Sequence, residues 1–132
     1  GIELKFELIK FLSDKGIETI DLGPGYNEKA DYPDIAEKVC NDVTSGNSEL
    51  GILVCGTGVG MSISANKIKG IRAAAVSDVY SAAMSKKHNN ANVVGFGLAK
   101  MIVEAWINET FDGGRHQDRV DLISNLDNKY RN

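Results

Sequence analysis

Apolar residues recur along the chain in two alternating patterns, short continuous runs and longer stretches with helical spacing. The short runs predict buried strands over residues 18–22, 50–54, 71–76 and 92–96. The longer stretches predict helices over residues 2–14, 33–44, 62–67, 78–88, 98–110 and 115–129. Continuously apolar strands that alternate with helices are typical of a parallel sheet covered on both faces. The pattern therefore predicts one α/β domain, spanning residues 1–132, with a parallel sheet.

The same alternation predicts that the intact protein has more residues at two places. The sequence opens in a helix, whereas an alternating design of this kind calls for a leading strand. The last predicted strand reaches the next helix through Gly97 alone, whereas such connections usually take roughly 2–6 residues. We therefore expect a first strand and a loop after Gly97 that the sequence does not include.

Composition and charge narrow the partners of the domain. A net charge of −3 leaves no broad basic surface, so nucleic acid is not an expected partner. No apolar run approaches the roughly 20 residues that cross a membrane. Cys40 and Cys55 lie in different contexts, which does not suggest a disulfide and fits a cytoplasmic protein. The spacing of histidine, cysteine and carboxylate residues shows no metal-ligating cluster, so we expect neither a metal nor a cofactor.

The segment from Gly51 to Ser62, with the sequence GILVCGTGVGMS, carries the most informative chemistry of the chain. A predicted strand ends at Cys55, glycines follow at every second position, and a helix then begins. Glycines let backbone N–H groups approach a ligand, and the positive end of the helix dipole adds to their attraction for an anion. The same field stabilises a thiolate at Cys55. The segment therefore predicts a base or nucleophile beside an oxyanion site.

Other glycine-rich loops fit this segment less well. A Walker A loop needs a lysine directly after its last glycine. The first lysine that follows this glycine-rich segment is Lys67, which lies too far along the chain. The dinucleotide pattern G-x-G-x-x-G is one residue longer than the spacing found. Asp78 does lie where a ribose-binding carboxylate would fall, so a nucleotide site stays open. A cysteine phosphatase would place arginine where Met61 stands. Cys40, on the apolar stripe of a predicted helix, is expected in the core.

A polar group precedes the last predicted strand. His88 and Asn89 stand there, where they either end a helix or take part in chemistry. In the second case His88 would move a proton and Asn89 would bind a hydroxyl. Thr57, in the glycine-rich turn, is likewise either a turn residue or a hydrogen-bonding partner of the substrate.

Two arginines on the last predicted helix are the candidates for binding phosphate. Arg115 and Arg119 are four positions apart and share one face, which is either a solvated charged surface or a phosphate site. The helix dipole disfavours cations in the first turns, and a bound phosphate would relieve that conflict. His116, between them, is expected at the surface.

A set of short motifs runs through the chain. They are CGTGVGMS from Cys55, Ala65-Asn66-Lys67, Gly70-Ile71-Arg72-Ala73, Ser81, Met84-Ser85, His88-Asn89, Ala91-Asn92, Gly114-Arg115-His116-Gln117 and Arg119-Val120. In this order they resemble the type B ribose-5-phosphate isomerases, a family that includes allose-6-phosphate and galactose-6-phosphate isomerases. The resemblance covers essentially the whole chain. It implies a Rossmann-like three-layer α/β/α sandwich, metal-free isomerisation in pentose phosphate metabolism, and a homodimer with shared sites, with a tetramer left open.

The resemblance also implies a role for the glycine-rich turn. Cys55 would be the base that moves a proton between C1 and C2 of the sugar. The backbone of the turn would hold the enediolate oxygens, through residues Gly56, Gly58, Val59 and Gly60.

The other candidate residues receive their roles in the same way. Thr57 and His88 would assist opening of the furanose ring, and Asn89 would bind a sugar hydroxyl. Arg115 and Arg119 would take the phosphate, in a site that the other subunit completes. The family also carries an Asp-His pair at the end of its first strand and an arginine in the loop that follows the last strand. Neither is in this sequence, where both would belong to the missing pieces.

The leading interpretation is an aldose–ketose isomerase. It would interconvert ribose 5-phosphate and ribulose 5-phosphate through an enediolate, with a cysteine as the base. One alternative is an isomerase of allose 6-phosphate or galactose 6-phosphate. The other is a nucleotide- or sugar-phosphate-binding domain without turnover.

Overall fold

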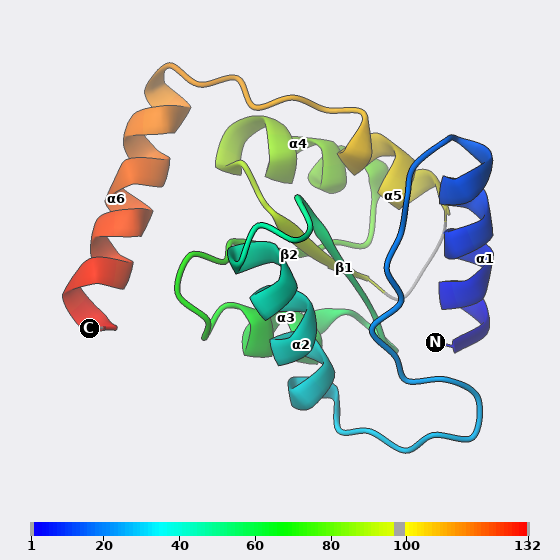
Figure 1. Ribbon diagram of the computed structural model, residues 1–132. Helices are drawn as coiled ribbons and strands as arrows, with labels where there is room; N and C mark the ends of the chain where they lie inside the picture. The colour runs from blue at the N-terminus through cyan, green and yellow to red at the C-terminus, as the bar shows by residue number, and fades with distance from the viewer. Residues whose placement is uncertain (1, 97–99, 132) are drawn as a thin grey trace.

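A three-stranded parallel sheet forms the centre of the computed structural model, which describes residues 2–96 and 100–131 (Figure 1). Its strands are β1 (Gly51–Val54), β2 (Ala73–Ala75) and β3 (Val93–Phe96), in the spatial order β1-β3-β2. β3 is the central strand, where Val93 pairs with Gly51 on one side and with Ala73 on the other. All four residues of β3 are buried, as its continuous apolar run predicts.

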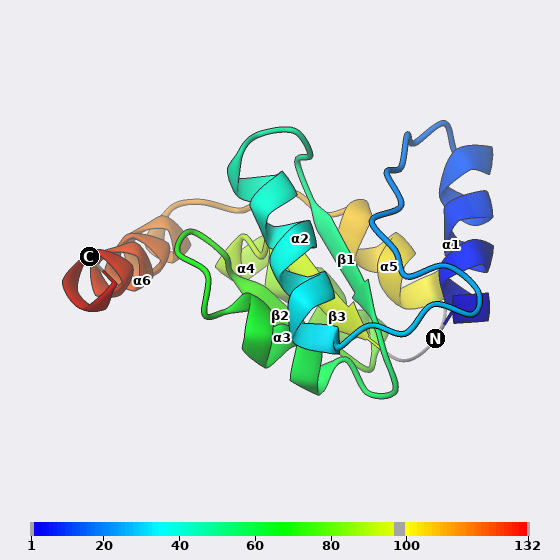
Figure 2. The same ribbon diagram turned by 60° about the horizontal axis from the view of Figure 1, so that its bottom comes forward.

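Helices cover both faces of the sheet (Figures 1 and 2). They are α1 (Ile2–Asp14), α2 (Tyr32–Thr44), α3 (Val59–Ala65), α4 (Val79–Asn89), α5 (Lys100–Ile107) and α6 (Arg115–Tyr130). On one face, Val94 and Phe96 pack with α1, α4 and α5 around the fully buried Trp106. On the other face, Val93 packs with α2 and α3 around Cys40. Neighbouring residues of β3 point into different cores because side chains alternate along a strand, so the structure has the three predicted layers.

Local signals set several helix ends where the sequence predicts them. Gly16 adopts a left-handed φ of 78° just after α1. Pro33 lies in the first turn of α2, and the Asp78 carboxylate caps α4 by accepting a hydrogen bond from the Ser81 N–H at 2.7 Å. α3 differs, since it begins at Val59 rather than at residue 62. Among the described residues, no helix is both long enough and apolar enough to cross a membrane.

The prediction of a strand over residues 18–22 is wrong, because this segment pairs with no strand of the described sheet. It runs beside α1, where the Lys5 ammonium donates to the Asp21 carboxylate at 3.0 Å and to the carbonyl of Pro24. The outer edge of β1 instead borders a cavity of about 940 Å³ between α1, α2 and residues 17–24. A strand needs a neighbour for its N–H and C=O groups, so an apolar run alone does not make one. The leading strand stays a prediction, and the connection after Gly97 lies outside the described residues.

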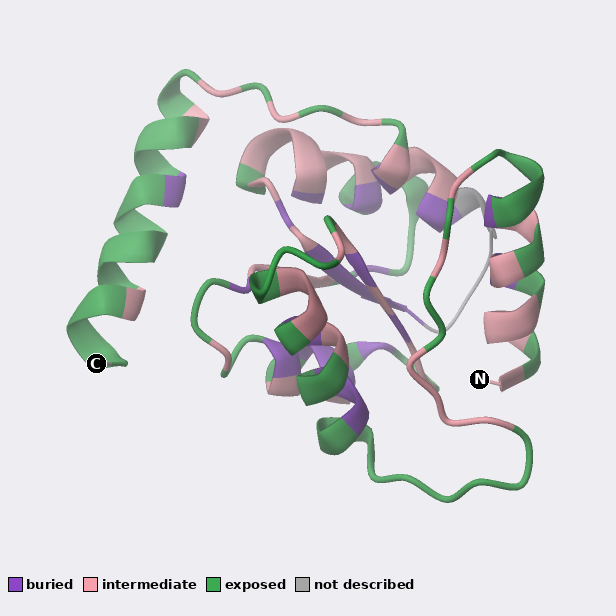
Figure 3. Cartoon of the chain, viewed as in Figure 1, coloured by how far each residue is buried: buried purple, intermediate pink, exposed green. Residues whose placement is uncertain are grey.

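The last helix, α6, stands apart from the rest of the domain (Figures 1 and 3). Of its described residues, only Val120 is buried. Its C-terminal end is held by a hydrogen bond from the Gly70 N–H to Asp127, at 2.9 Å, and by another from Arg131 to the carbonyl of Asn66. Large apolar side chains are exposed along it, namely Leu122, Ile123, Leu126 and Tyr130. An exposed apolar face of this kind is typical of an interaction surface.

Candidate active site

The glycine-rich segment forms a tight turn at the carboxyl end of β1. The N–H of Cys55 donates to the carbonyl of Phe96 at 3.3 Å, which holds this residue beside the end of β3. Its Sγ accepts a hydrogen bond from the Gly58 N–H at 3.0 Å, and the residue is half-buried. The N–H of Val59 donates to Thr57 Oγ1 at 3.2 Å. The turn therefore holds the thiol against a backbone donor, at the sheet edge where parallel α/β folds bind their ligands.

The three glycines of this turn serve different purposes. Gly58 has a left-handed φ of 79°, and a Cβ there would overlap the backbone of Gly95. A Cβ on Gly60 would lie 2.9 Å from the ring of Tyr32. At Gly56 a Cβ would have nothing within 4 Å. All three were expected to make room for a ligand, whereas backbone packing requires Gly58, the exposed Tyr32 side chain limits the space at Gly60, and Gly56 borders open space.

Gly58→Ala is expected to lower the free energy of unfolding by at least about 2 kcal/mol, because the added Cβ combines a left-handed backbone with overlap of β3. Gly56→Ala is the matched control, expected within about 0.5 kcal/mol of wild type, since it meets open space. Urea unfolding followed by circular dichroism measures both variants. Equal stability of the two would contradict the packing role of Gly58.

The two cysteines differ in accessibility. Cys40 is fully buried, and burial raises the pKa of its thiol to about 11, whereas Cys55 is half-buried at the turn. We expect iodoacetamide to alkylate Cys55 and to spare Cys40 in the folded protein, because the thiolate is the reactive form. Mass spectrometry of digested protein, with labelling before and after unfolding in urea, measures this. Alkylation of Cys40 in the folded protein would contradict it.

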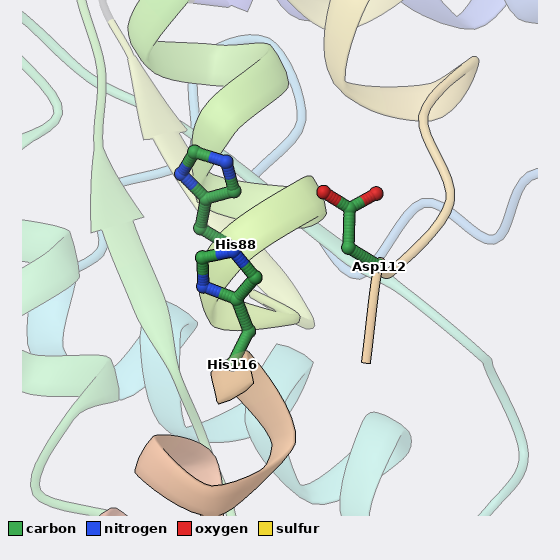
Figure 4. A group of neighbouring side chains, drawn as sticks. All are labelled: His88, Asp112 and His116. Atoms are coloured by element: carbon green, nitrogen blue, oxygen red, sulfur yellow. The ribbon is translucent and has the colours of Figure 1, made fainter. Parts of the chain in front are cut away.

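A second group of side chains lies where α4 ends and α6 begins (Figure 4). The rings of His88 and His116 stack, with centroids 4.3 Å apart and planes 9° apart. The N–H of Asp112 donates to the carbonyl of Lys87 at 2.9 Å, which brings the Asp112 carboxylate close to both rings. Burial lowers the pKa of His116, and the charges of His88 and Arg115 add to this effect while Asp112 opposes it.

This group corrects two expectations from the sequence. His116 was expected at the surface, whereas it is half-buried against His88. No metal-ligating cluster was expected, whereas one ligand atom each from His88, Asp112 and His116 lie within 4.8 Å of one another. Spacing along the chain could not reveal this cluster, because a helix end, a loop and a helix start from separate segments form it. The sequence offered only a weak signal: His88 directly precedes Asn89, and His116 follows Gly114 by two residues.

The remaining candidate residues lie at the ends of the same two helices. Arg115 and Arg119 are exposed in the first turns of α6, and neither joins an ion pair within the described part of the chain. Both carry charges that act on His116. Asn89 is exposed at the end of α4 and borders a small cavity of about 250 Å³. Two such guanidinium groups beside an imidazole pair form a cationic surface that suits a phosphate.

The structure does not bring the thiol turn and this second group together within one chain, because the turn follows β1 whereas the group lies where α4 ends and α6 begins. Cys55 lies at the carboxyl edge of the sheet. Arg72, just before β2, donates its Nε–H to the carbonyl of Asn90 at 2.9 Å, which places the end of α4 at the amino edge. The four residues of β3 separate the two edges, about 13 Å at roughly 3.3 Å per residue. Thr57 and His88, expected to act on the same sugar, therefore lie at opposite edges.

The parallel sheet, its two helical layers and the thiol at a strand-end turn define a Rossmann-like α/β domain with a candidate site at its carboxyl edge. The chain belongs to the Ribose/Galactose Isomerase family, whose model matches residues 1–123. It is 46% identical over 136 residues to ribose-5-phosphate isomerase B of Escherichia coli strain K12, an alignment that covers 98% of this chain and 91% of that protein.

Solved structures agree with this assignment. Ribose-5-phosphate isomerase B of Clostridium thermocellum superposes with a TM-score of 0.92 at 44% identity, covering 97% of this chain and 91% of that one. The Mycoplasma genitalium ribose-5-phosphate isomerase B, solved with bound ribulose-5-phosphate, has a TM-score of 0.91 at 39% identity and covers 98% and 91% of the two chains. The Rossmann-like three-layer prediction is therefore confirmed.

Proposed function

We propose that the chain is an aldose–ketose isomerase that interconverts ribose 5-phosphate and ribulose 5-phosphate. The observation that carries the proposal is the Cys55 thiol, held by the Gly58 N–H at 3.0 Å beside the open space at Gly56. Membership of the Ribose/Galactose Isomerase family and the relatives named ribose-5-phosphate isomerase B support it. The two unpaired thiols support a cytoplasmic location.

The isomerisation needs a base and a site for a developing oxyanion. The Cys55 thiolate takes the proton from C2 of the open-chain aldose, and the electron pair moves towards the carbonyl to form an enediolate. The thiol returns the proton to C1 while a proton passes between O2 and O1, which gives the ketose. The backbone N–H groups of residues 56–60 stabilise the enediolate oxygens. Loss of one such donor costs roughly 3–4 kcal/mol of transition-state stabilisation in other enzymes.

The second group of residues opens and positions the sugar. His88 gives a proton to the ring oxygen as the furanose opens, with the Thr57 hydroxyl assisting. Asn89 binds a sugar hydroxyl, and Arg115 and Arg119 bind the phosphate through paired N–H donors. Each of these roles needs contact with the same substrate molecule that Cys55 deprotonates.

A second copy of the chain supplies this second group in our proposal. The two groups lie at opposite sheet edges of one chain, so a homodimer would join the thiol turn of one subunit to His88 of the other. The apolar side chains exposed along α6, such as Leu122 and Leu126, lie on the same helix as Arg115 and Arg119 and support such an interface. Two-fold symmetry would then give each dimer two equivalent sites.

Proton NMR of ribose 5-phosphate in D₂O, with the protein and EDTA, tests the proposed reaction. We expect ribulose 5-phosphate to form and deuterium to enter at C1 or C2, since the enediolate exchanges its proton with solvent. No conversion would overturn the ribose 5-phosphate assignment. The same experiment with allose 6-phosphate and galactose 6-phosphate then separates a six-carbon isomerase from a binding domain without turnover.

Arg119→Ala is expected to raise the KM for ribose 5-phosphate roughly tenfold or more with little change in kcat, because a charged hydrogen bond to the phosphate is lost. Lys129→Ala is the matched control, since it removes an exposed cation from the other end of α6. Steady-state kinetics of both variants measure the effect. An unchanged KM in Arg119→Ala, or an equal rise in the control, would contradict the phosphate assignment.

A further inference from the structure

The group formed by His88, Asp112 and His116 contains two side chains, Asp112 and His116, to which the proposed isomerisation gives no role. Two stacked imidazole rings and one carboxylate converge there from the end of α4, the loop before α6 and the first turn of α6 (Figure 4). These are the only two histidines in the chain. One ligand atom from each residue lies within 4.8 Å of the others.

We infer that His88, Asp112 and His116 form a binding site for a divalent transition-metal ion, with Zn²⁺ as the ion of choice. Imidazole nitrogens suit zinc and its transition-metal neighbours, whereas magnesium and calcium take oxygen ligands. Three protein ligands of this kind leave a fourth tetrahedral position for water or for an oxygen of a bound molecule.

The three side chains are available for this role. Within the described part of the chain, none of them makes a side-chain hydrogen bond or an ion pair. His88 and His116 are half-buried, which shields a bound ion from water, while Asp112 is exposed on a loop.

A small movement completes the geometry. Tetrahedral zinc, with bonds of about 2.0–2.2 Å, needs ligand atoms about 3.3–3.5 Å apart, so the stacked rings must turn towards the carboxylate. The Asp112 loop and the first turn of α6 can provide that turn, because α6 has only Val120 buried among its described residues. Arg115 and Arg119 repel a cation, so we expect reversible binding rather than a permanent structural ion.

Metal binding itself does not depend on the proposed isomerase activity. Its expected effect, inhibition of the isomerase, rests on the proposed function. A Zn²⁺ ion on His88 would occupy the imidazole that we assign to ring opening. Zinc would then inhibit the isomerase, and Asp112→Asn would relieve the inhibition.

The test uses the full chain, without a histidine tag, titrated with Co²⁺ and followed by visible absorption, with Zn²⁺ added to displace it. We expect one Co²⁺ per chain, with the intense absorption of a tetrahedral site. Asp112→Asn and His116→Gln should each weaken binding by more than the roughly 10- to 100-fold that follows loss of a residue that only orients a ligand. Asp118→Asn is the matched control. It removes an exposed carboxylate from α6, the helix that carries His116, and should bind Co²⁺ like wild type.

Three results would overturn the inference. They are no binding of Co²⁺ or Zn²⁺ by the wild-type chain, unchanged affinity in folded Asp112→Asn and His116→Gln, and loss of binding in Cys55→Ser, which would place the ion on the thiol instead. Circular dichroism of each variant confirms that it is folded. Because the titration contains no sugar phosphate, its outcome is independent of whether the isomerase proposal holds.

Discussion

Cys55→Ala is expected to reduce the turnover of ribose 5-phosphate by a factor of about 10²–10⁴, the usual contribution of a general base. The methyl group cannot accept the C2 proton, whereas the backbone N–H groups and the phosphate-binding arginines remain. Binding of sugar phosphates should therefore change little. Deuterium exchange followed by NMR measures the turnover, and isothermal titration calorimetry with ribose 5-phosphate measures the binding.

Cys40→Ala is the matched control for this variant. It removes the other thiol of the chain, which is fully buried in the core between α2 and the sheet. It should lower stability through the lost packing and leave kcat per folded molecule unchanged. A Cys55→Ala protein that keeps the turnover of wild type would contradict the assignment of the base, and would direct the search to another group near the Gly56 turn.

Mixing two inactive variants is expected to restore activity. Cys55→Ala removes the base from the thiol turn, and His88→Asn removes the proton donor from the opposite sheet edge. If each site joins the two edges across a dimer, a mixed dimer contains one intact site and one doubly damaged site. Random pairing makes half of the dimers mixed, so the mixture should regain about a quarter of the wild-type activity.

The experiment unfolds and refolds the two variants together and measures activity against equimolar wild type. Each variant refolded alone is the control and should stay inactive. Activity of the mixture no higher than that of the separate variants would contradict a shared site. It would mean that the thiol turn and His88 act independently, although one chain holds them at opposite edges.

Much of the fold follows from local pattern. The buried run that ends at Phe96 becomes the central strand, because every one of its side chains needs a core on one face or the other. Asp78 and Gly16 set helix ends through short-range hydrogen bonding and backbone freedom, which act within a few residues. Residues 18–22 have a similar apolar pattern but form no strand, because pairing depends on a neighbour that the pattern cannot supply.

The candidate site, like the fold, could be predicted from the sequence only in part. The thiol turn could be predicted because Cys55, Gly56 and Gly58 lie within four consecutive residues directly after a buried strand. The contact of His88 with His116 could not be predicted from the sequence, because it depends on how the loop before α6 returns to the end of α4. The different roles of the glycines also became clear only from the tertiary structure, since a Cβ at Gly58 would overlap the backbone of β3, a strand distant in the sequence.

The sequence by itself determined the alternation of helices and strands, the family resemblance and the position of a thiol at a strand-end turn, because these depend on side chains close together in the chain. Only the tertiary structure decided that the candidate residues form two groups at opposite edges of the sheet. Only the tertiary structure brought two histidines and Asp112 within ligand distance of one another. The physical reason is that a parallel sheet sends the start and the end of each connecting helix to opposite edges, whatever the residues on that helix are.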